Sequence, residues 1–153
     1  MPVVDHLVES YLVDAHAIYT FYRFERLPID LEIEGGVAQR FGSYHQTEFG
    51  LIPMMRWKAF PWNKYVYTNF RVGVFGASYA TGVSSWEAVN ADNGGKGSRY
   101  LNFLRYEFTF APSADSPYEV FIGLHHRSGI YGLINHSHGG SNYWITGIRF
   151  SFL

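Results

Sequence analysis

The chain has 153 residues, of which 47% are hydrophobic and 19% aromatic, and its formal net charge is -1. A chain of this length is expected to form one domain, with ample apolar surface to bury or to present to lipid. The near-zero charge argues against a nucleic-acid partner, which requires a basic surface. The absence of cysteine excludes disulfides, thiolate zinc sites and a cysteine nucleophile.

The start of the chain differs from a secretory signal peptide in two respects. Residues 1–16 have neither the basic flank nor the apolar core of a secretory signal peptide. No apolar run is long enough for a membrane-spanning helix. We therefore expect either an intracellular protein or a processed or truncated chain, with a single domain over 1–153 in which the role of residues 1–10 is uncertain.

The periodicity of the chain indicates an all-β fold. In chain order, strands are predicted near 11–26, 30–42, 46–59, 64–80, 98–111, 117–128 and 142–152. Turn-forming stretches such as LPID, FPWN and PSADSP separate them. The longer connections are a loop at 81–97 and a hairpin loop rich in glycine and histidine at 129–141. The only helix-like stretch lies near Val3–Val13.

The strands alternate between a broad apolar face and a small or polar face. In the last strand, one face carries Trp144, Thr146, Ile148, Phe150 and Phe152, and the other carries Ile145, Gly147, Arg149 and Ser151. Similar splits are predicted in 46–58 and in 66–75, where Phe75 falls on the same face as Arg71. Alternation alone fits both a soluble sandwich and a membrane barrel.

Three features favour an antiparallel up-and-down transmembrane β-barrel. Several strands reach the roughly 9–11 residues that cross a bilayer at a tilt. Aromatic residues crowd the strand ends, as in AIYTFYRF and FPWNKYVY, which is typical of rings at lipid–water interfaces. The chain also ends in an aromatic, alternating strand, GIRFSFL. Because single-chain bacterial barrels have even strand numbers, an eighth strand is expected in residues 1–10 or outside this sequence.

In the predicted strand YEVFIGLHHRS, two neighbouring histidines face opposite sides of the sheet. His126 and Ser128 share the apolar, outward face, whereas His125 and Arg127 point inward, beside Glu119 and the strand that holds Arg105 and Glu107. A histidine two residues from a serine on one pleated face can take the hydroxyl proton, which is the minimum for a serine nucleophile. Glu107 is predicted to pair with Arg105, Arg127 or Arg149.

A third polar group is needed to orient the histidine. Asn142 lies on the outward face of the last strand, and a hairpin with Ser128 opposite Asn142 would place it diagonally from His126. The backbone of Gly129 or the side chain of Asn135 could form an oxyanion hole. Polar groups facing lipid are costly unless they have a function, so a lipid substrate is expected.

Metal binding is the alternative use of the histidines. His136 and His138 occupy alternate positions of the glycine-rich loop. No carboxylate lies within the hairpin to complete a hard metal site. The serine site is therefore favoured, with no metal and no cofactor.

The stretches YLNFLRYEFTFAP, HHRSGIYGL and GGSNYWITGIRFSF resemble the lipid A 3-O-deacylase (PagL-like) family, also described as acyloxyacyl hydrolase-like. The resemblance implies an eight-stranded barrel of the bacterial outer membrane that removes an ester-linked acyl chain from the lipid A of lipopolysaccharide. It implies Ser128 as nucleophile and His126 as base. The family's glutamate has no match, so Asn142 is the nearest substitute and Glu87 a second candidate acid. A homodimer is left open.

Two alternatives remain at this stage. One is an inactive outer-membrane barrel of the same fold, which binds lipid or is structural. The other is a soluble β-barrel that binds a small apolar ligand inside, which requires the apolar face to point inward.

Overall fold

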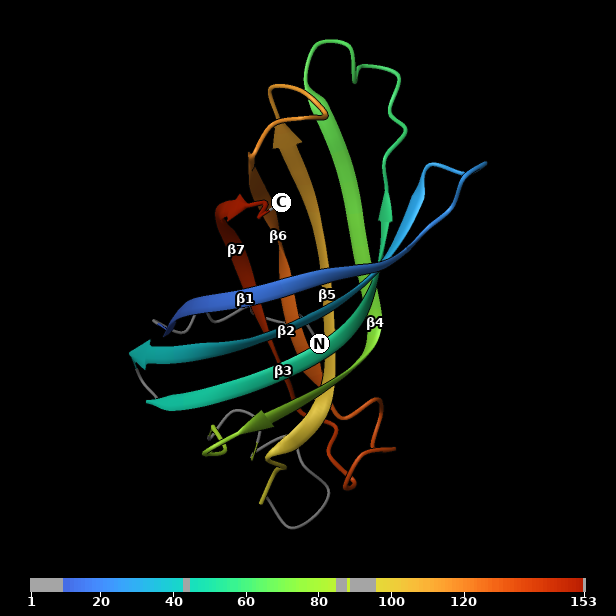
Figure 1. Cartoon of the computed structure of the whole chain (residues 1–153). Helices are drawn as coiled ribbons and strands as arrows, with labels where there is room; N and C mark the ends of the chain where they lie inside the picture. The colour runs from blue at the N-terminus through green and yellow to red at the C-terminus, as the bar shows by residue number, and fades with distance from the viewer. Residues whose placement is uncertain (1–9, 43–44, 85–87, 89–95, 153) are drawn as a thin grey trace, which may run out of the picture.

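The computed structural model describes residues 10–42, 45–84, 88 and 96–152, and these form one curled sheet of seven antiparallel strands (Figure 1). Each strand pairs with the next along the chain, so the topology is up-and-down, as predicted. The strands are β1 (Ser10–Arg23), β2 (Ile29–Gly42), β3 (Gln46–Trp57), β4 (Tyr67–Ala80), β5 (Tyr100–Ala111), β6 (Tyr118–Ser128) and β7 (Gly140–Phe150). Residues 10–13 of the helix-like stretch belong to β1, and the rest of that stretch lies outside the described residues.

The connections divide the sheet into two ends. At one end of the sheet, here called the turn end, β1 is followed by β2, β3 by β4 and β5 by β6. At the other end, the loop end, lie the end of β2 and the start of β3, the end of β4 and the start of β5, and the end of β6 and the start of β7. β1 starts at the loop end, because Ser10 pairs with Gly42. β7 finishes at the turn end, where the Ser151 N–H donates to the Pro117 carbonyl at 2.8 Å. The residues described contain no helix that could span a membrane.

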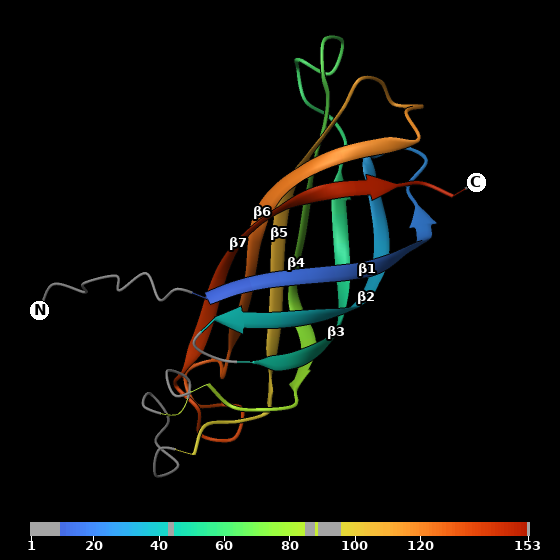
Figure 2. The same cartoon turned by 90° about the vertical axis from the view of Figure 1, so that its left-hand side faces the viewer.

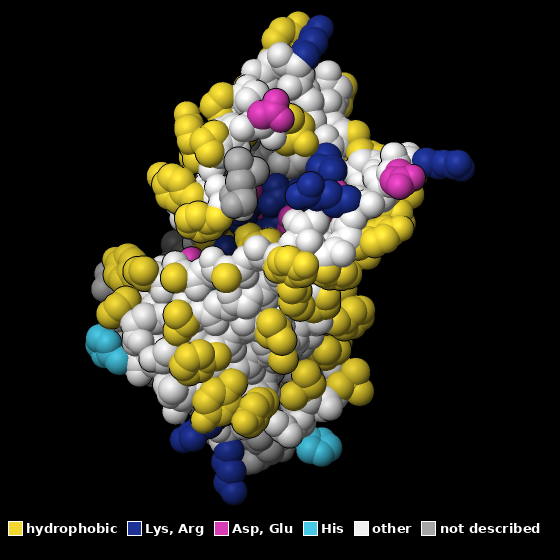
Figure 3. All heavy atoms as spheres, viewed as in Figure 1, with side chains coloured by type: hydrophobic (Ala, Val, Ile, Leu, Met, Phe, Trp, Pro, Cys, Tyr) yellow, Lys and Arg dark blue, Asp and Glu magenta, His cyan; other side chains and the backbone are white. Residues whose placement is uncertain are grey.

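The predicted direction of the strand faces is confirmed on β6 and β7. Val120 and Ile122 are 47% and 50% exposed. Phe121, which lies between them, and Arg127, which lies nearer the loop end, are buried. The same alternation runs along β7, where Trp144 is 80% exposed. Apolar side chains therefore cover the outside of the sheet (Figure 3). The soluble barrel with an apolar interior is wrong, because the apolar faces point outward.

A β-bulge corrects the predicted phase of β4. The register with β5 shifts between Gly73 and Gly76, so residues after the bulge change face relative to those before it. Phe75 was expected inside with Arg71, but it is 75% exposed while Arg71 is fully buried. Gly76 makes the shift possible, since a Cβ there would lie 2.8 Å from the Phe103 carbonyl oxygen.

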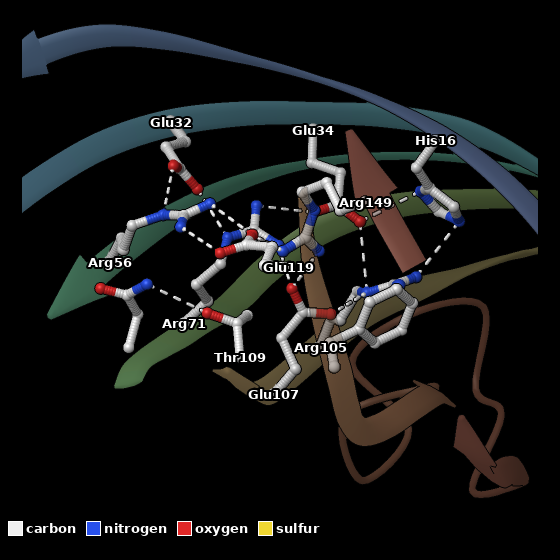
Figure 4. Close-up of polar contacts among 12 residues, drawn as sticks. His16, Glu32, Glu34, Arg56, Arg71, Arg105, Glu107, Thr109, Glu119 and Arg149 are labelled. Atoms are coloured by element: carbon white, nitrogen blue, oxygen red, sulfur yellow. Dashed lines mark hydrogen bonds and ion pairs between the residues drawn. The ribbon is translucent and has the colours of Figure 1, made fainter. Parts of the chain in front are cut away.

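A network of charged side chains fills the interior (Figure 4). Arg71 is its centre and donates to Glu32 at 2.7 Å, to Glu34 at 2.8 Å and to Glu107. Arg105 extends the network to Glu34 and Glu107, each at 3.2 Å. The other members are Asp14, His16, Arg56, Glu119 and Arg149. The predicted pairing of Glu107 with Arg105 and Arg149 is confirmed.

A second polar cluster lies closer to the loop end and corrects the predicted partners of β6. His125 and Arg127 do point inward, but they meet Glu48, at 3.0 and 3.4 Å, rather than Glu119 or Glu107. Glu48 also accepts from Arg40 at 2.7 Å and from Ser78 at 2.7 Å. Glu48 of β3 thus pairs with both inward residues of β6 across the interior. Strand phase cannot reveal such a partner, because the two strands are far apart in the sequence.

The sheet does not close between its first and last strands. β1 and β7 approach near their starts, where the Ser10 hydroxyl lies 2.9 Å from the Tyr143 hydroxyl, and separate toward the turn end (Figure 2). A cleft of about 620 Å³ opens there, lined by outward residues such as Trp144 and Ile148 and inward residues such as Asp14 and Arg149. Figure 3 shows this side hollowed, with charged side chains visible inside.

The interior network should dominate stability. We expect Arg71→Ala to lower the free energy of unfolding by about 3–5 kcal/mol, because three buried carboxylates lose the cation that they share. Arg23→Ala, on the exposed end of β1, should change it by no more than about 0.5 kcal/mol. Urea unfolding followed by tryptophan fluorescence measures both, and equal losses in the two variants would refute the central role of Arg71.

Candidate functional site

The candidate site lies on the outer wall of β5, β6 and β7, beside the loop end. The sheet register pairs His126 with Asn142 and Ser128 with Gly140. The predicted pairing of Ser128 with Asn142 is therefore wrong by two residues, since β7 begins at Gly140 rather than at residue 142. A Cβ at Gly140 would lie 2.4 Å from the Arg127 carbonyl oxygen, so only glycine lets β7 run this close to β6 at that position.

The register brings the predicted base and its orienting group into direct contact. His126 Nδ1 lies 2.5 Å from Asn142 Oδ1. Because an amide oxygen can only accept, the ring donates from Nδ1, and Nε2 keeps a lone pair. This is the tautomer that a general base needs when its Nδ1 side is held by a third group.

The Ser128 side chain lies on the same face as that of His126 but is not hydrogen-bonded to it. Within the described part of the chain, no hydrogen bond joins the Ser128 hydroxyl to the His126 ring. Alternate residues of a strand are about 6.8 Å apart, so side-chain rotation decides whether the two groups meet. Catalytic hydrogen bonds are often loose without substrate and tighten when it binds. Both side chains are half-buried.

The two predicted oxyanion donors are occupied elsewhere. The Gly129 N–H donates to the Gly139 carbonyl at 3.2 Å. The Asn135 amide donates to the Ser98 hydroxyl at 2.8 Å, which ties the 129–139 loop to the end of the 81–99 loop. Neither group is directed at an ester bound to Ser128, so this prediction from sequence receives no support from the geometry.

The loop that follows Ser128 has an unusual backbone. Ile130, Tyr131, Asn135 and His136 all have φ between 48° and 53°, a region that a β-branched residue such as Ile130 rarely adopts. Ser137 at the base of the loop is fully buried. Strain of this kind persists only where the surrounding structure imposes it. Here the Gly129–Gly139 hydrogen bond joins the loop ends, and Ser98 holds Asn135 in the middle of the loop.

Sequence inspection missed one polar residue of the site, Asn102. It pairs with Ser128 across β5 and β6, so both side chains lie on the outer face, and Asn102 is only 7% exposed. Its amide donates to the Val74 carbonyl at 3.0 Å. The sequence did contain a signal for this residue: Asn102 is an even number of residues from Tyr106 and Phe108, so strand alternation places its side chain on the same outward face.

The remaining candidates contribute less. Glu87 lies outside the described residues, so its use as an acid is not tested. His136 and His138 are exposed in the loop. Among the side chains that the structure describes, no group of three or more histidine, cysteine, aspartate or glutamate residues could hold a metal ion.

The His126–Asn142 contact makes a prediction that does not depend on activity. At a pH where the ring is neutral, His126 should be the Nδ1–H tautomer in the wild type. Asn142→Leu should release it toward the Nε2–H form that free imidazole side chains prefer. Ring ¹⁵N shifts of detergent-solubilised protein report the tautomer, and identical shifts in the two proteins would contradict the assigned hydrogen bond.

Comparisons with protein-family models, with curated proteins and with solved structures found no match for this chain. The relation to lipid A deacylases therefore stays a resemblance carried by the motifs around Ser128.

Proposed function

We propose that this protein is an outer-membrane β-barrel serine esterase that hydrolyses an ester-linked acyl chain of lipopolysaccharide. The observation that carries the proposal is a cluster of polar side chains on a mainly apolar outer wall. In this cluster Asn142 holds the His126 ring two residues from Ser128. Such groups are expensive against hydrocarbon, and a lipid ester is the substrate that reaches them there.

The membrane assignment rests on the inverted distribution of side chains. Charged residues are buried inside, whereas large apolar residues are exposed outside, which is the pattern of a barrel in lipid. Exposed aromatic side chains gather near both ends of the strands. At the loop end these are Tyr11, Phe41, Phe49, Phe75 and Tyr100, and at the turn end Phe21, Tyr22, Trp57, Trp62, Tyr65 and Tyr118.

An eighth strand is part of the proposal. β1 and β7 both run from the loop end to the turn end, so they are parallel and cannot pair in the antiparallel manner of the rest of the sheet. One strand between them, running from the turn end to the loop end, would be antiparallel to both. It would fill the cleft and remove the two open edges, which membrane barrels do not leave exposed to lipid.

The orientation places the site in the outer leaflet. Barrels of the outer membrane have short periplasmic turns and longer external loops, so the loop end is external. Ser128 is the last residue of β6 at that end. Lipopolysaccharide occupies the external leaflet, and its ester bonds lie near the boundary between sugar and acyl chains, at the level of the site.

The reaction follows from the positions of the three groups. His126 Nε2 takes the Ser128 hydroxyl proton as Oγ attacks the ester carbonyl carbon. The tetrahedral intermediate collapses, the C–O bond to the sugar breaks, and the released alkoxide takes the proton from His126. Water then enters, and its oxygen attacks the acyl carbon as His126 accepts its proton. The C–Oγ bond breaks, the acyl chain leaves as a carboxylic acid, and Ser128 Oγ takes the proton back from His126. Asn142 fixes the ring but adds no negative charge to stabilise the imidazolium.

A second candidate is an inactive barrel of the same fold. Two observations favour it: Asn142 stands where a carboxylate would stabilise a protonated ring, and in the described residues Ser128 makes no hydrogen bond to His126. Replacing the acid of a serine-protease triad by its amide lowers kcat by about 10⁴. The inactive barrel and the esterase share a membrane location and differ in turnover.

The membrane location predicts a large effect of charge at the middle of the outer wall. Ile122→Arg should lower the free energy of folding into lipid vesicles by about 2–4 kcal/mol, because it sets a charge at the bilayer midplane. In a soluble protein, an exposed isoleucine could be replaced at little cost. Asp115→Arg, in the link between β5 and β6, is the control. Equal, small effects would refute the membrane assignment.

The esterase predicts a change in lipid A. Bacteria that make the wild-type protein should yield lipid A lacking one acyl chain, and the Ser128→Ala variant should leave lipid A intact, with activity reduced at least about 10³-fold. Mass spectrometry of extracted lipid A measures both. Loss of the chain in both samples would remove Ser128 from the mechanism, and loss in neither would establish the inactive barrel.

A further inference from the structure

We infer that Asn102 is a catalytic residue of this site and supplies the oxyanion-hole donor through the free N–H of its side-chain amide. The inference rests on the proposed esterase function and adds a residue to it. Asn102 comes from β5, a strand to which neither the sequence motifs nor the His126–Asn142 contact assigns a catalytic role.

The first argument is position. Asn102 and Ser128 are directly paired across β5 and β6. Side chains of such pairs share a face, with Cβ atoms about 4.5–5.5 Å apart. His126 sits two residues along β6 and Asn142 beyond it on β7, so the acyl carbonyl on Ser128 is bordered by His126 on one side and by Asn102 on the other.

The second argument is orientation. The Asn102 Nδ2 donates one hydrogen to the Val74 carbonyl at 3.0 Å. Val74 lies in the bulge of β4, where its carbonyl has left the regular ladder with β5. This bond fixes the plane of the amide, and the second Nδ2 hydrogen remains for a ligand. At 7% exposure, the group is largely shielded before substrate arrives, as a preorganised oxyanion donor should be.

The third argument is the position of the other candidate donors. Gly129 N–H is bound to the Gly139 carbonyl and the Asn135 amide to the Ser98 hydroxyl. Asn142 is paired with His126 rather than with Ser128, and its amide oxygen faces the ring. Among the described amide side chains, Asn102 is the one paired directly with Ser128, and it has a hydrogen to spare.

In the reaction, the negative charge that develops on the carbonyl oxygen as Ser128 attacks would accept the second Nδ2–H of Asn102. This donor strengthens in the transition state more than in the ground state, so its loss should lower kcat and leave KM nearly unchanged. A purely structural Asn102, which only satisfies the Val74 carbonyl, would instead affect folding and not turnover.

The experiment compares three variants of the full chain in detergent, with a p-nitrophenyl ester as substrate and a fluorophosphonate to count active serines. Asn102→Ala removes both hydrogens. Asn102→Thr retains a hydroxyl donor for the Val74 carbonyl but has no second hydrogen. Thr146→Val is the matched control, because Thr146 also lies on the outer wall and donates to a backbone carbonyl, that of Phe121 at 2.8 Å, away from Ser128.

We expect kcat per active serine to fall about 10²–10³-fold in both Asn102 variants, with KM within about twofold and Thr146→Val unchanged. A folded Asn102→Thr protein with wild-type kcat overturns the inference, as does a fall equal to that of Thr146→Val. If the wild type and the Asn102 variants are equally active, the proposed esterase function is kept and only the role of Asn102 is rejected. A wild type without turnover, or whose turnover survives Ser128→Ala, overturns the proposed function and the inference with it.

Discussion

The buried ion network around Arg71 is the constraint on which the rest of the structure depends. Arg71 contacts Glu32, Glu34 and Glu107 in the middle of the interior. Charges removed from water need partners with good geometry, so most charged residues of the strands point into the interior. The alternate residues then face outward, and most of them are apolar. A polar side chain on the outer wall is consequently an exception to the pattern, and His126, Ser128, Asn142 and Asn102 are such exceptions.

The same network explains the shape of the candidate site. In the described residues, paired charged side chains occupy the middle of the interior, and the proposed reaction on a lipid is accordingly assigned to the outer wall. Three neighbouring strands each contribute one part of the outer site: Asn102 from β5, His126 and Ser128 from β6, and Asn142 from β7. Because they are fixed by backbone pairing, their relative positions are set by register rather than by a flexible loop.

The open edge between β1 and β7 bears on how the barrel closes rather than on the proposed reaction. The cleft there lets Asp14, His16, Arg105 and Arg149 reach the side of the molecule, an arrangement that hydrocarbon would penalise. An additional antiparallel strand would cover these groups and extend the apolar wall beyond Trp144. The proposed barrel therefore needs closure for membrane stability, while the strand that carries His126 and Ser128, β6, is already paired on both sides.

The sequence by itself determined the seven strands, their up-and-down order and which residues of β6 and β7 face outward, because alternation and turn residues are local signals. It therefore identified His126 and Ser128 as neighbours. Tertiary structure decided what depends on strand pairing. The register that Gly140 permits places Asn142 opposite His126. The bulge in β4 turns Phe75 outward, and Glu48 rather than Glu119 is the partner of His125. Asn102 became visible only beside Ser128, since cross-strand neighbours are set by hydrogen bonding between distant segments, which no local period encodes.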